Sequence, residues 1–226
     1  MEYIKRNLEA VQAELAEAAT RAGREDHVSM IAAVKYATDE ELAALLDLGV
    51  TDVGENRVQQ LLLHYPQYEN SNVRVHFIGT LQKNKIKYII DKVYAIHSVD
   101  SVALAREIDR HAVGRGVRMR VYAEVNIGRE EAKSGVMPEA ALDLCREILA
   151  LENLELVGLM TMAPRCESEA EYRAYFAALC ALAGNIEKEL ALATPLALSM
   201  GMSESFTAAV LEGASSVRVG RRLFAK

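Results

Sequence analysis

Short apolar runs and segments with helical spacing alternate eight times along the 226 residues of this chain. Each run is rich in Val, Ile and Leu, as in strands that are buried on both faces of a parallel sheet. The expected strands cover 28–34, 51–54, 73–78, 93–96, 118–125, 156–160, 196–198 and 216–219. The expected helices cover 1–22, 39–49, 55–64, 82–91, about 100–114, a segment opening at Pro138, 167–190 and 204–212.

This alternation predicts an α/β fold, a single (β/α)8 barrel of the TIM type with an extra N-terminal helix, and residues 1–226 as one domain. An open, doubly wound sheet is the alternative arrangement of the same elements. It is disfavoured because no Gly-x-Gly-x-x-Gly follows the first strand and no Gly-x-x-x-x-Gly-Lys-Ser/Thr loop occurs in the chain.

Charge and composition exclude several classes of protein. The net charge is −6 and the only dense basic segment is 83–87, so we expect no nucleic-acid partner. Cys145, Cys166 and Cys180 show neither a disulfide framework nor zinc spacing, which predicts a reducing, cytoplasmic location and no metal. Residues 1–23 resemble an amphipathic helix rather than a signal peptide, and no apolar run approaches the roughly 20 residues of a membrane span. We therefore expect no membrane partner and, from the chain length, a monomer.

Lys35 directly follows the first expected strand, 28–34. Ligands of barrels collect at the carboxyl ends of the strands, so this amine is expected at the mouth of the barrel, partly removed from water. A neutral primary amine attacks carbonyl carbons, which makes Lys35 a candidate for a Schiff base. The alternative is a solvated lysine whose alkyl chain covers the end of the strand.

The loops after the last two strands carry the features of an anion site. Ser199 to Ser203 is a small, hydroxyl-bearing turn before the expected helix 204–212, and Ser203 is a candidate for its N-cap. Gly220 follows the eighth strand and would let backbone amides approach the same anion. Barrels often bind phosphate with these two loops. The alternative is that Ser203 is only a cap and Gly220 only a turn.

A reactive lysine beside a phosphate site fits two ligands: a sugar phosphate held as a Schiff base, and pyridoxal 5′-phosphate (PLP), whose aldehyde condenses with lysine. Arg218 favours PLP. It lies on the strand beside the first strand, two residues before Gly220, which suits a contact to the pyridine nitrogen of a flat ring. The alternative is that Arg218 pairs with a carboxylate such as Glu124.

Eight motifs follow one another along the chain: Ala32-Ala-Val-Lys35-Tyr36, Gly54-Glu-Asn-Arg-Val-Gln59, His76-Phe-Ile-Gly-Thr-Leu-Gln-Lys-Asn-Lys85, His97-Ser-Val-Asp100, Lys133-Ser-Gly135, Gly158-Leu-Met-Thr-Met162, Ser199-Met-Gly-Met-Ser203 and Arg218-Val-Gly-Arg221. Together they resemble the pyridoxal phosphate homeostasis proteins over essentially the whole chain, and the combination is far more specific than any one motif. The resemblance implies a (β/α)8 barrel similar to the N-terminal domain of alanine racemase, with PLP held by Lys35 as an internal aldimine.

The resemblance also assigns the other cofactor contacts. They are Asn56 near the 3′ oxygen of the ring, Ser199 and Ser203 on the phosphate with the backbone amides of Gly220 and Arg221, Arg218 at the pyridine nitrogen, and His76 and Met200 lining the pocket. Family members often carry Thr or Ser after the glycine, whereas this chain has Arg221 and Arg222, whose side chains either add phosphate affinity or point to solvent. Lys133 is the second candidate for the reactive amine, and a plain loop turn is its alternative.

The function that the resemblance implies is non-enzymatic: storing PLP or delivering it to PLP-dependent apo-enzymes in intracellular vitamin B6 homeostasis. Related racemases use a second domain, for which this chain leaves no residues, and a tyrosine base from a partner chain. Arginine also stays protonated, which makes the ring a weaker electron sink than a carboxylate partner would. The alternative is a PLP-dependent racemase or lyase, and a Schiff-base aldolase comes third. A carrier should have no tyrosine, cysteine or second lysine within proton-transfer reach on the face opposite Lys35.

Overall fold

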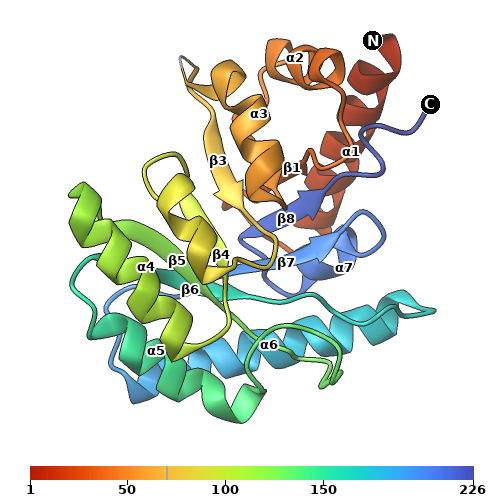
Figure 1. Cartoon of the computed structure of the whole chain (residues 1–226). Coiled ribbons are helices and arrows are strands. Elements are labelled where there is room, and N and C mark those ends of the chain that lie inside the picture. The colour runs from red at the N-terminus through yellow and green to blue at the C-terminus, as the bar shows by residue number, and fades with distance from the viewer. Residues whose placement is uncertain (70) are drawn as a thin grey trace.

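Eight parallel strands close into one barrel, with each strand paired to the next and β8 paired to β1 (Figure 1). The structure is a computed structural model that describes residues 1–69 and 71–226. The strands are β1 (Ser29–Ala33), β2 (Asp52–Glu55), β3 (Arg74–Phe77), β4 (Ala95–Val99), β5 (Met119–Glu124), β6 (Leu154–Met160), β7 (Ala197–Met202) and β8 (Ser216–Val219). The predicted (β/α)8 fold is confirmed.

Helices connect the strands and cover the outside of the barrel. The α-helices are α1 (Glu2–Arg21), α2 (Asp39–Asp47), α3 (Val58–Tyr68), α4 (Val102–Arg115), α5 (Ala141–Leu149), α6 (Glu169–Glu189) and α7 (Phe206–Leu211), and the 3₁₀ helices are η1 (Lys83–Tyr88) and η2 (Pro138–Ala140). The predicted extra helix is α1, whose Asn7 side chain donates to Ala225 O at 2.7 Å, so the two chain ends lie together (Figure 1). Within the described residues, no helix is both long and apolar enough to cross a bilayer.

The helix expected over 82–91 is shorter than expected and is a 3₁₀ helix, because the segment forms η1 and then turns. Lys85 N donates to Gln82 O, and Ile89 N donates to Ile86 O, both with the three-residue spacing of a 3₁₀ helix. Three residues per turn place Ile86 and Ile89 on one side, and both side chains are fully buried. Tight burial of two isoleucines therefore outweighs the weaker hydrogen-bond geometry.

The expected end of the third helix before Pro66 is also wrong, since α3 continues through Pro66 to Tyr68. Proline removes one helical hydrogen bond. Tyr68 compensates because its ring is buried and its hydroxyl donates to Glu55 Oε1 at 2.8 Å. The start is later than expected because Glu55 is the last residue of β2.

Part of the barrel interior is polar, because His76, His97, Ser199 and Arg218 are buried there and hydrogen-bonded in sequence. Barrels of this type are mostly filled by bulky branched side chains. Here the interior holds a small apolar cluster of Ala95, Tyr122 and Met160, and the ring of His97 stacks on Tyr122 at a centroid distance of 4.1 Å. The large apolar core lies instead between the strands and the surrounding helices.

Candidate functional site

A pocket of about 360 Å³ opens at the carboxyl ends of the strands, and we call it the carboxyl-end pocket. Its lining residues are at or just beyond strand ends: Ala33, Lys35, Tyr36, Asn56, Ile78, Met162, Met202, Ser203, Arg218, Gly220 and Arg221. Six of the nine residues predicted to bind a cofactor are among them. The topology thus brings together side chains that are up to 186 positions apart in the chain, from Lys35 to Arg221.

Lys35 lies two residues beyond β1, at the mouth of the carboxyl-end pocket. Its side chain is exposed, so the expected partial removal of this amine from water is wrong. Nζ lies 4.8 Å from the centroid of the Tyr36 ring, and Tyr36 is itself 71% exposed. The amine is therefore accessible to a ligand and to water.

Arg218 closes the floor of the pocket from β8. Its Nη1 donates to Ser199 Oγ and its Nη2 to Thr161 O, both at 2.8 Å. Burial lowers the pKa of Arg218 to about 10, and the charge of Glu124 opposes that shift. Among the residues that the structure describes, Arg218 forms its side-chain hydrogen bonds with Ser199 and Thr161 and no ion pair with Glu124, which acts on it through space. The alternative of a direct Arg218–Glu124 pair is therefore wrong.

Asn56 contributes an unused hydrogen-bonding group. Its Oδ1 atom is buried and has no partner among the described residues. The Asn56 backbone is held closely from behind, since a Cβ on Gly79 would lie only 2.1 Å from Asn56 O. A buried polar atom without a partner is costly, so it marks a place where a ligand would donate a hydrogen bond.

The loops after β7 and β8 meet at the pocket, but through a contact that differs from the expected one. Ser203 is not the N-cap of α7; that position belongs to Ser205, whose Oγ accepts from Met202 N at 3.1 Å. Ser203 Oγ instead accepts from Gly220 N at 3.3 Å, which joins the two loops. Within residues 1–69 and 71–226, the amides of Ser203 and Arg221 donate to no protein acceptor.

Glycine at position 220 has a packing reason as well. A Cβ there would lie 2.8 Å from Ala33 O, so only glycine lets β8 end so close to β1. Arg221 lines the pocket and pairs with Glu204 at 3.0 Å, whereas Arg222 points away and donates to Glu14 Oε2 at 2.7 Å. The side chain of Arg221 thus lies at the pocket, and that of Arg222 does not.

Three predicted residues, Ser199, His76 and Met200, do not line the pocket. Ser199 and His76 point into the barrel and hydrogen-bond to other interior side chains. Met200 lies in the core between the strands and the helices. A bulge follows it, where Gly201 has a φ of 90°, and the bulge turns Met202 toward the pocket in its place.

Sequence reasoning missed Asp52, and it included His97 and Thr161 in motifs without giving either side chain a role. His97 Nε2 lies 2.9 Å from His76 Nδ1, and His76 Nε2 lies 2.9 Å from Asp52 Oδ1. The available signal was the alternation of side chains along the strands, which points one face of each strand inward. Lys133 lies outside the pocket and pairs with Glu130 at 3.7 Å.

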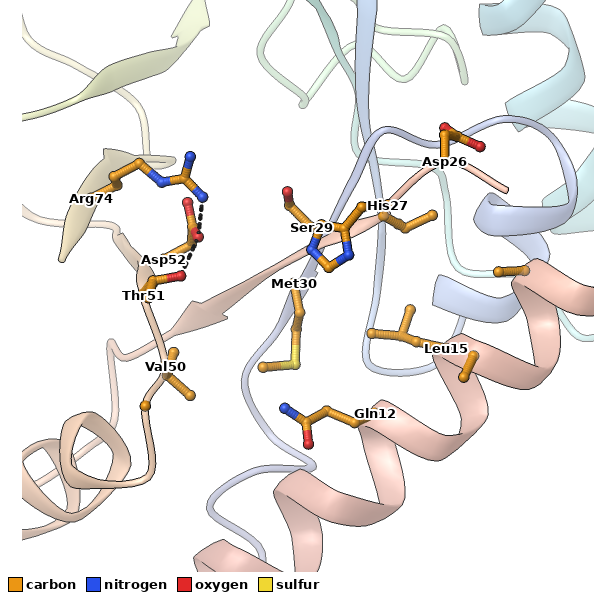
Figure 2. Close-up of a pocket in the computed structure, with 14 residues that line it drawn as sticks. Gln12, Leu15, Asp26, His27, Ser29, Met30, Val50, Thr51, Asp52 and Arg74 are labelled. Carbon is orange, nitrogen blue, oxygen red and sulfur yellow. Dashed lines mark hydrogen bonds and ion pairs between the residues drawn. The ribbon is translucent and has the colours of Figure 1, made fainter. Parts of the chain in front are cut away.

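A second cavity, of about 390 Å³, lies at the opposite end of the barrel, and we call it the amino-end cavity (Figure 2). Ser29, Asp52 and Arg74, which line it, are the first residues of β1, β2 and β3. Asp52 accepts hydrogen bonds from Arg74 at 2.6 Å and from Thr51 at 2.9 Å. The charges of Asp52 and Arg74 in this cavity are therefore paired with each other.

Comparisons with known proteins are consistent with this geometry. Residues 6–225 match the family described as "Alanine racemase, N-terminal domain". A pyridoxal phosphate homeostasis protein of Aquifex aeolicus is 40% identical over 224 residues, 99% of this chain and 96% of that protein. PipY of Synechococcus elongatus, solved with PLP bound, is 29% identical with a TM-score of 0.81, covering 93% of this chain and 100% of PipY. Alanine racemase of Clostridium difficile, at 16% identity and a TM-score of 0.77, shares the fold over 57% of its chain and 100% of this one.

Proposed function

Because this chain belongs to the alanine racemase N-terminal domain family, and within it to the pyridoxal phosphate homeostasis proteins, we propose that it binds PLP in the carboxyl-end pocket and serves PLP homeostasis. One observation carries the proposal. An accessible lysine amine, a buried guanidinium and an unpartnered amide oxygen, from Lys35, Arg218 and Asn56, meet in one pocket.

The donor set of this pocket fits each group of PLP. Lys35 offers the amine for the aldehyde, and Arg218 offers N–H groups for the ring nitrogen. The free Asn56 oxygen accepts from the ring hydroxyl. The phosphate would lie against the Ser203 hydroxyl and the free amides of Ser203 and Arg221.

Retention is favoured over catalysis by the chemistry of Arg218. Bound PLP supplies an aldehyde carbon that condenses with a neutral primary amine with loss of one water molecule. Arg218 keeps its proton even with a pKa of about 10, so it donates a hydrogen bond to the ring nitrogen without protonating it. An unprotonated ring withdraws electrons weakly, and the pocket therefore holds an aldehyde better than it activates a substrate.

The test is the absorption spectrum of the purified protein with PLP, before and after borohydride reduction, followed by peptide mapping. We expect a visible band that borohydride abolishes and a label on the peptide that contains Lys35. A protein that develops no band with added PLP would refute PLP binding. A label on the Lys133 peptide would refute the assignment of the amine.

We further propose that the protein hands PLP to apo-enzymes. The exposure of Lys35 and Tyr36 supports this, because a partner or water reaches the amine without any opening of the barrel. Loaded protein should reactivate a PLP-dependent apo-enzyme in the presence of a phosphatase that destroys free PLP. If the phosphatase suppresses reactivation completely, transfer passes through free solution and direct delivery is refuted.

A second candidate function, an amino-acid racemase or lyase, is favoured by Tyr36 alone. A tyrosine does line the pocket, although it is adjacent to Lys35 rather than opposite to it. A phenol near the reacting centre is a candidate acid or base. Exchange of the Cα hydrogen of amino acids in heavy water, lost in Tyr36→Phe, would establish the enzyme. If no amino acid shows exchange, the enzyme is refuted and the proposed carrier function stands.

A further inference from the structure

Five buried side chains form a continuous hydrogen-bond chain through the barrel, which we call the polar spine: Asp52, His76, His97, Ser199 and Arg218, each at most 6% exposed. Asp52 Oδ1 lies 2.9 Å from His76 Nε2, and His76 Nδ1 lies 2.9 Å from His97 Nε2. His97 Nδ1 lies 2.9 Å from Ser199 Oγ, which accepts from Arg218 Nη1 at 2.8 Å. The spine thus connects the amino-end cavity to the floor of the carboxyl-end pocket.

The two ends of the spine determine the direction of every bond in it. A carboxylate only accepts, so His76 donates to Asp52 from Nε2. A neutral imidazole has one donor and one acceptor, so His76 Nδ1 accepts from His97 Nε2, and His97 Nδ1 accepts the Ser199 hydroxyl hydrogen. The Ser199 oxygen then accepts from Arg218. All donors point from Arg218 toward Asp52, and both rings carry their proton on Nε2.

The reverse arrangement leaves a group without a partner. A charged His76 would donate to His97, which would in turn donate from Nδ1 to Ser199. The Ser199 hydroxyl hydrogen would then have no acceptor, because His97 and Arg218 are the partners of Ser199 Oγ in the described part of the chain. Such an orphan is costly in a fully buried residue. Burial, followed by repulsion from His76 and Arg218, also lowers the pKa of His97 well below its ordinary value.

Both ends of the spine are anchored. Arg74 and Thr51 bond to the Asp52 carboxylate (Figure 2). They donate to Oδ2 at 2.6 and 2.9 Å, which leaves Oδ1 to His76. At the other end, the Arg218 guanidinium has one anchor in the spine, Ser199 Oγ, and one in the backbone, Thr161 O. The orientation of its remaining N–H groups therefore depends on Ser199.

We propose that Asp52, at the far end of the barrel, is a positioning residue for the carboxyl-end pocket: its charge sets the tautomers of His76 and His97, which orient Ser199 and through it Arg218. The inference rests on the proposed function, because there Arg218 contacts the ring nitrogen. It has a sharp consequence for Asp52→Asn. Arg74 and Thr51 still require an acceptor, so the new amide oxygen faces them and its NH2 group faces His76. His76 Nε2 must then accept, so His76 donates from Nδ1 to His97 and His97 donates from Nδ1 to Ser199. The bond from Arg218 to Ser199 cannot reverse, so the Ser199 hydroxyl hydrogen loses its acceptor in the spine and the contact between Ser199 and Arg218 is disturbed.

The first test is nitrogen-15 NMR of the histidine rings in the ligand-free protein. We expect the Nε2–H tautomer for His76 and His97 in the natural sequence and the Nδ1–H tautomer for both in Asp52→Asn. Asp26→Asn is the matched control, since Asp26 lines the same cavity but pairs with Arg24, outside the spine. An Nδ1–H ring in the natural sequence, or a change in Asp52→Asn that stops at His76, would overturn the proposal.

The second test measures PLP affinity in a double-mutant cycle. Asp52→Asn should weaken binding roughly 2- to 30-fold, the range for substitutions that act through a network, and Asp26→Asn should change it less than twofold. Ser199→Ala interrupts the spine, so adding Asp52→Asn to it should cost no further affinity. Additive losses would refute coupling through Ser199. Failure of the natural sequence to bind PLP would instead refute the proposed function. The NMR result would still show whether Asp52 sets the tautomers of His76 and His97. Should Asp52→Asn not fold, the tautomers of the natural sequence and of Ser199→Ala decide it.

Discussion

The two ends of the barrel each hold a buried carboxyl group, and the two groups behave in opposite ways. At the amino end, burial raises the pKa of Asp52, but hydrogen bonds from His76, Arg74 and Thr51 outweigh it and bring the pKa to about 2. At the carboxyl end, burial and the charge of Asp100 raise the pKa of Glu124 to about 7, which Arg218 only partly offsets. The amino end satisfies its charge internally, while the carboxyl end keeps its polar groups incompletely paired.

The same contrast separates the two cavities. Their volumes are similar, about 390 Å³ at the amino end and about 360 Å³ at the carboxyl end. Asp52 and Arg74 at the amino end bond to each other, whereas Asn56 at the carboxyl end keeps a buried oxygen without a partner in the described residues. The unpartnered Asn56 oxygen, rather than volume, therefore supports the carboxyl-end pocket as the proposed ligand site.

The largest effect is expected for Lys35→Ala, which should abolish the visible absorption band of the protein with PLP. The residue is exposed beyond the end of β1, so the thermal unfolding midpoint should stay within about 2 °C, as for a surface substitution. Lys133→Ala is the matched control, because Lys133 is a loop lysine outside the pocket. A band that persists in Lys35→Ala and disappears in Lys133→Ala would reverse the assignment.

Arg218→Ala should have the next largest effect and weaken PLP binding by about 10- to 100-fold, the cost of losing a charged hydrogen-bond donor. Equilibrium dialysis measures it, with Arg221→Ala as the control. Arg221 lines the same pocket but is exposed and paired with Glu204, and the substitution keeps its backbone amide. Equal losses in the two variants would mean that positive charge, rather than the position of Arg218, holds the ligand.

The sequence predicted the barrel because short apolar runs in alternation with helices have few other solutions. It also placed Lys35, Asn56 and Ser203 at one pocket, since parallel strands end at the same edge. It could not place Met200, because the bulge at Gly201 shifts the register by one residue and reverses which side chain faces the pocket.

The inward side chains at mid-barrel were harder to predict. In the sequence, His97 is an ordinary polar residue at the end of an expected strand. Asp52 is an ordinary polar residue at the start of one. Their role depends on His76 of the neighbouring strand β3, which lies 2.9 Å from both, and for His97 also on Ser199 of β7, which the closed barrel brings to 2.9 Å. The accessibility of Lys35 likewise depends on how far the loop extends beyond β1, and no local pattern encodes that distance.

A pH series of stability separates the two buried carboxyl groups. The pKa of the Glu124 carboxyl is about 7 in the folded protein and 4.5 in the unfolded chain. Between these pH values the folded state therefore binds more protons than the unfolded state. Stability should therefore fall as pH rises from 4.5 to 7, by about 3 kcal/mol in total. Glu124→Gln should remove this fall and stabilise the ligand-free protein at pH 8, as measured by urea unfolding.

Asp52 should show the opposite pH dependence. The pKa of Asp52 is about 2 in the folded protein and 3.8 in the unfolded chain. Its contribution to the free energy of unfolding is therefore complete above pH 3.8 and is lost as the pH falls toward 2. Asp52→Asn should cost about 2 kcal/mol at pH 7 and almost nothing at pH 2. Glu131→Gln, at an exposed carboxyl, is the control, and its effect on the free energy of unfolding should be the same at every pH. Parallel curves for Glu124→Gln and Asp52→Asn would contradict the contrast between the two ends.

The smallest effect is expected when the amino-end cavity is filled. Ala16 lines this cavity from the exposed face of α1, and leucine is nearly as good a helix former as alanine. Ala16→Leu should therefore change PLP affinity less than twofold and stability by at most about 0.5 kcal/mol. The same substitution at the other end, Ala33→Leu, places a larger side chain in the carboxyl-end pocket and against Gly220, where a Cβ would already lie 3.2 Å from the Ala33 Cβ. It should abolish binding. A loss in Ala16→Leu comparable to that in Ala33→Leu would mean that ligand binding uses both ends of the barrel.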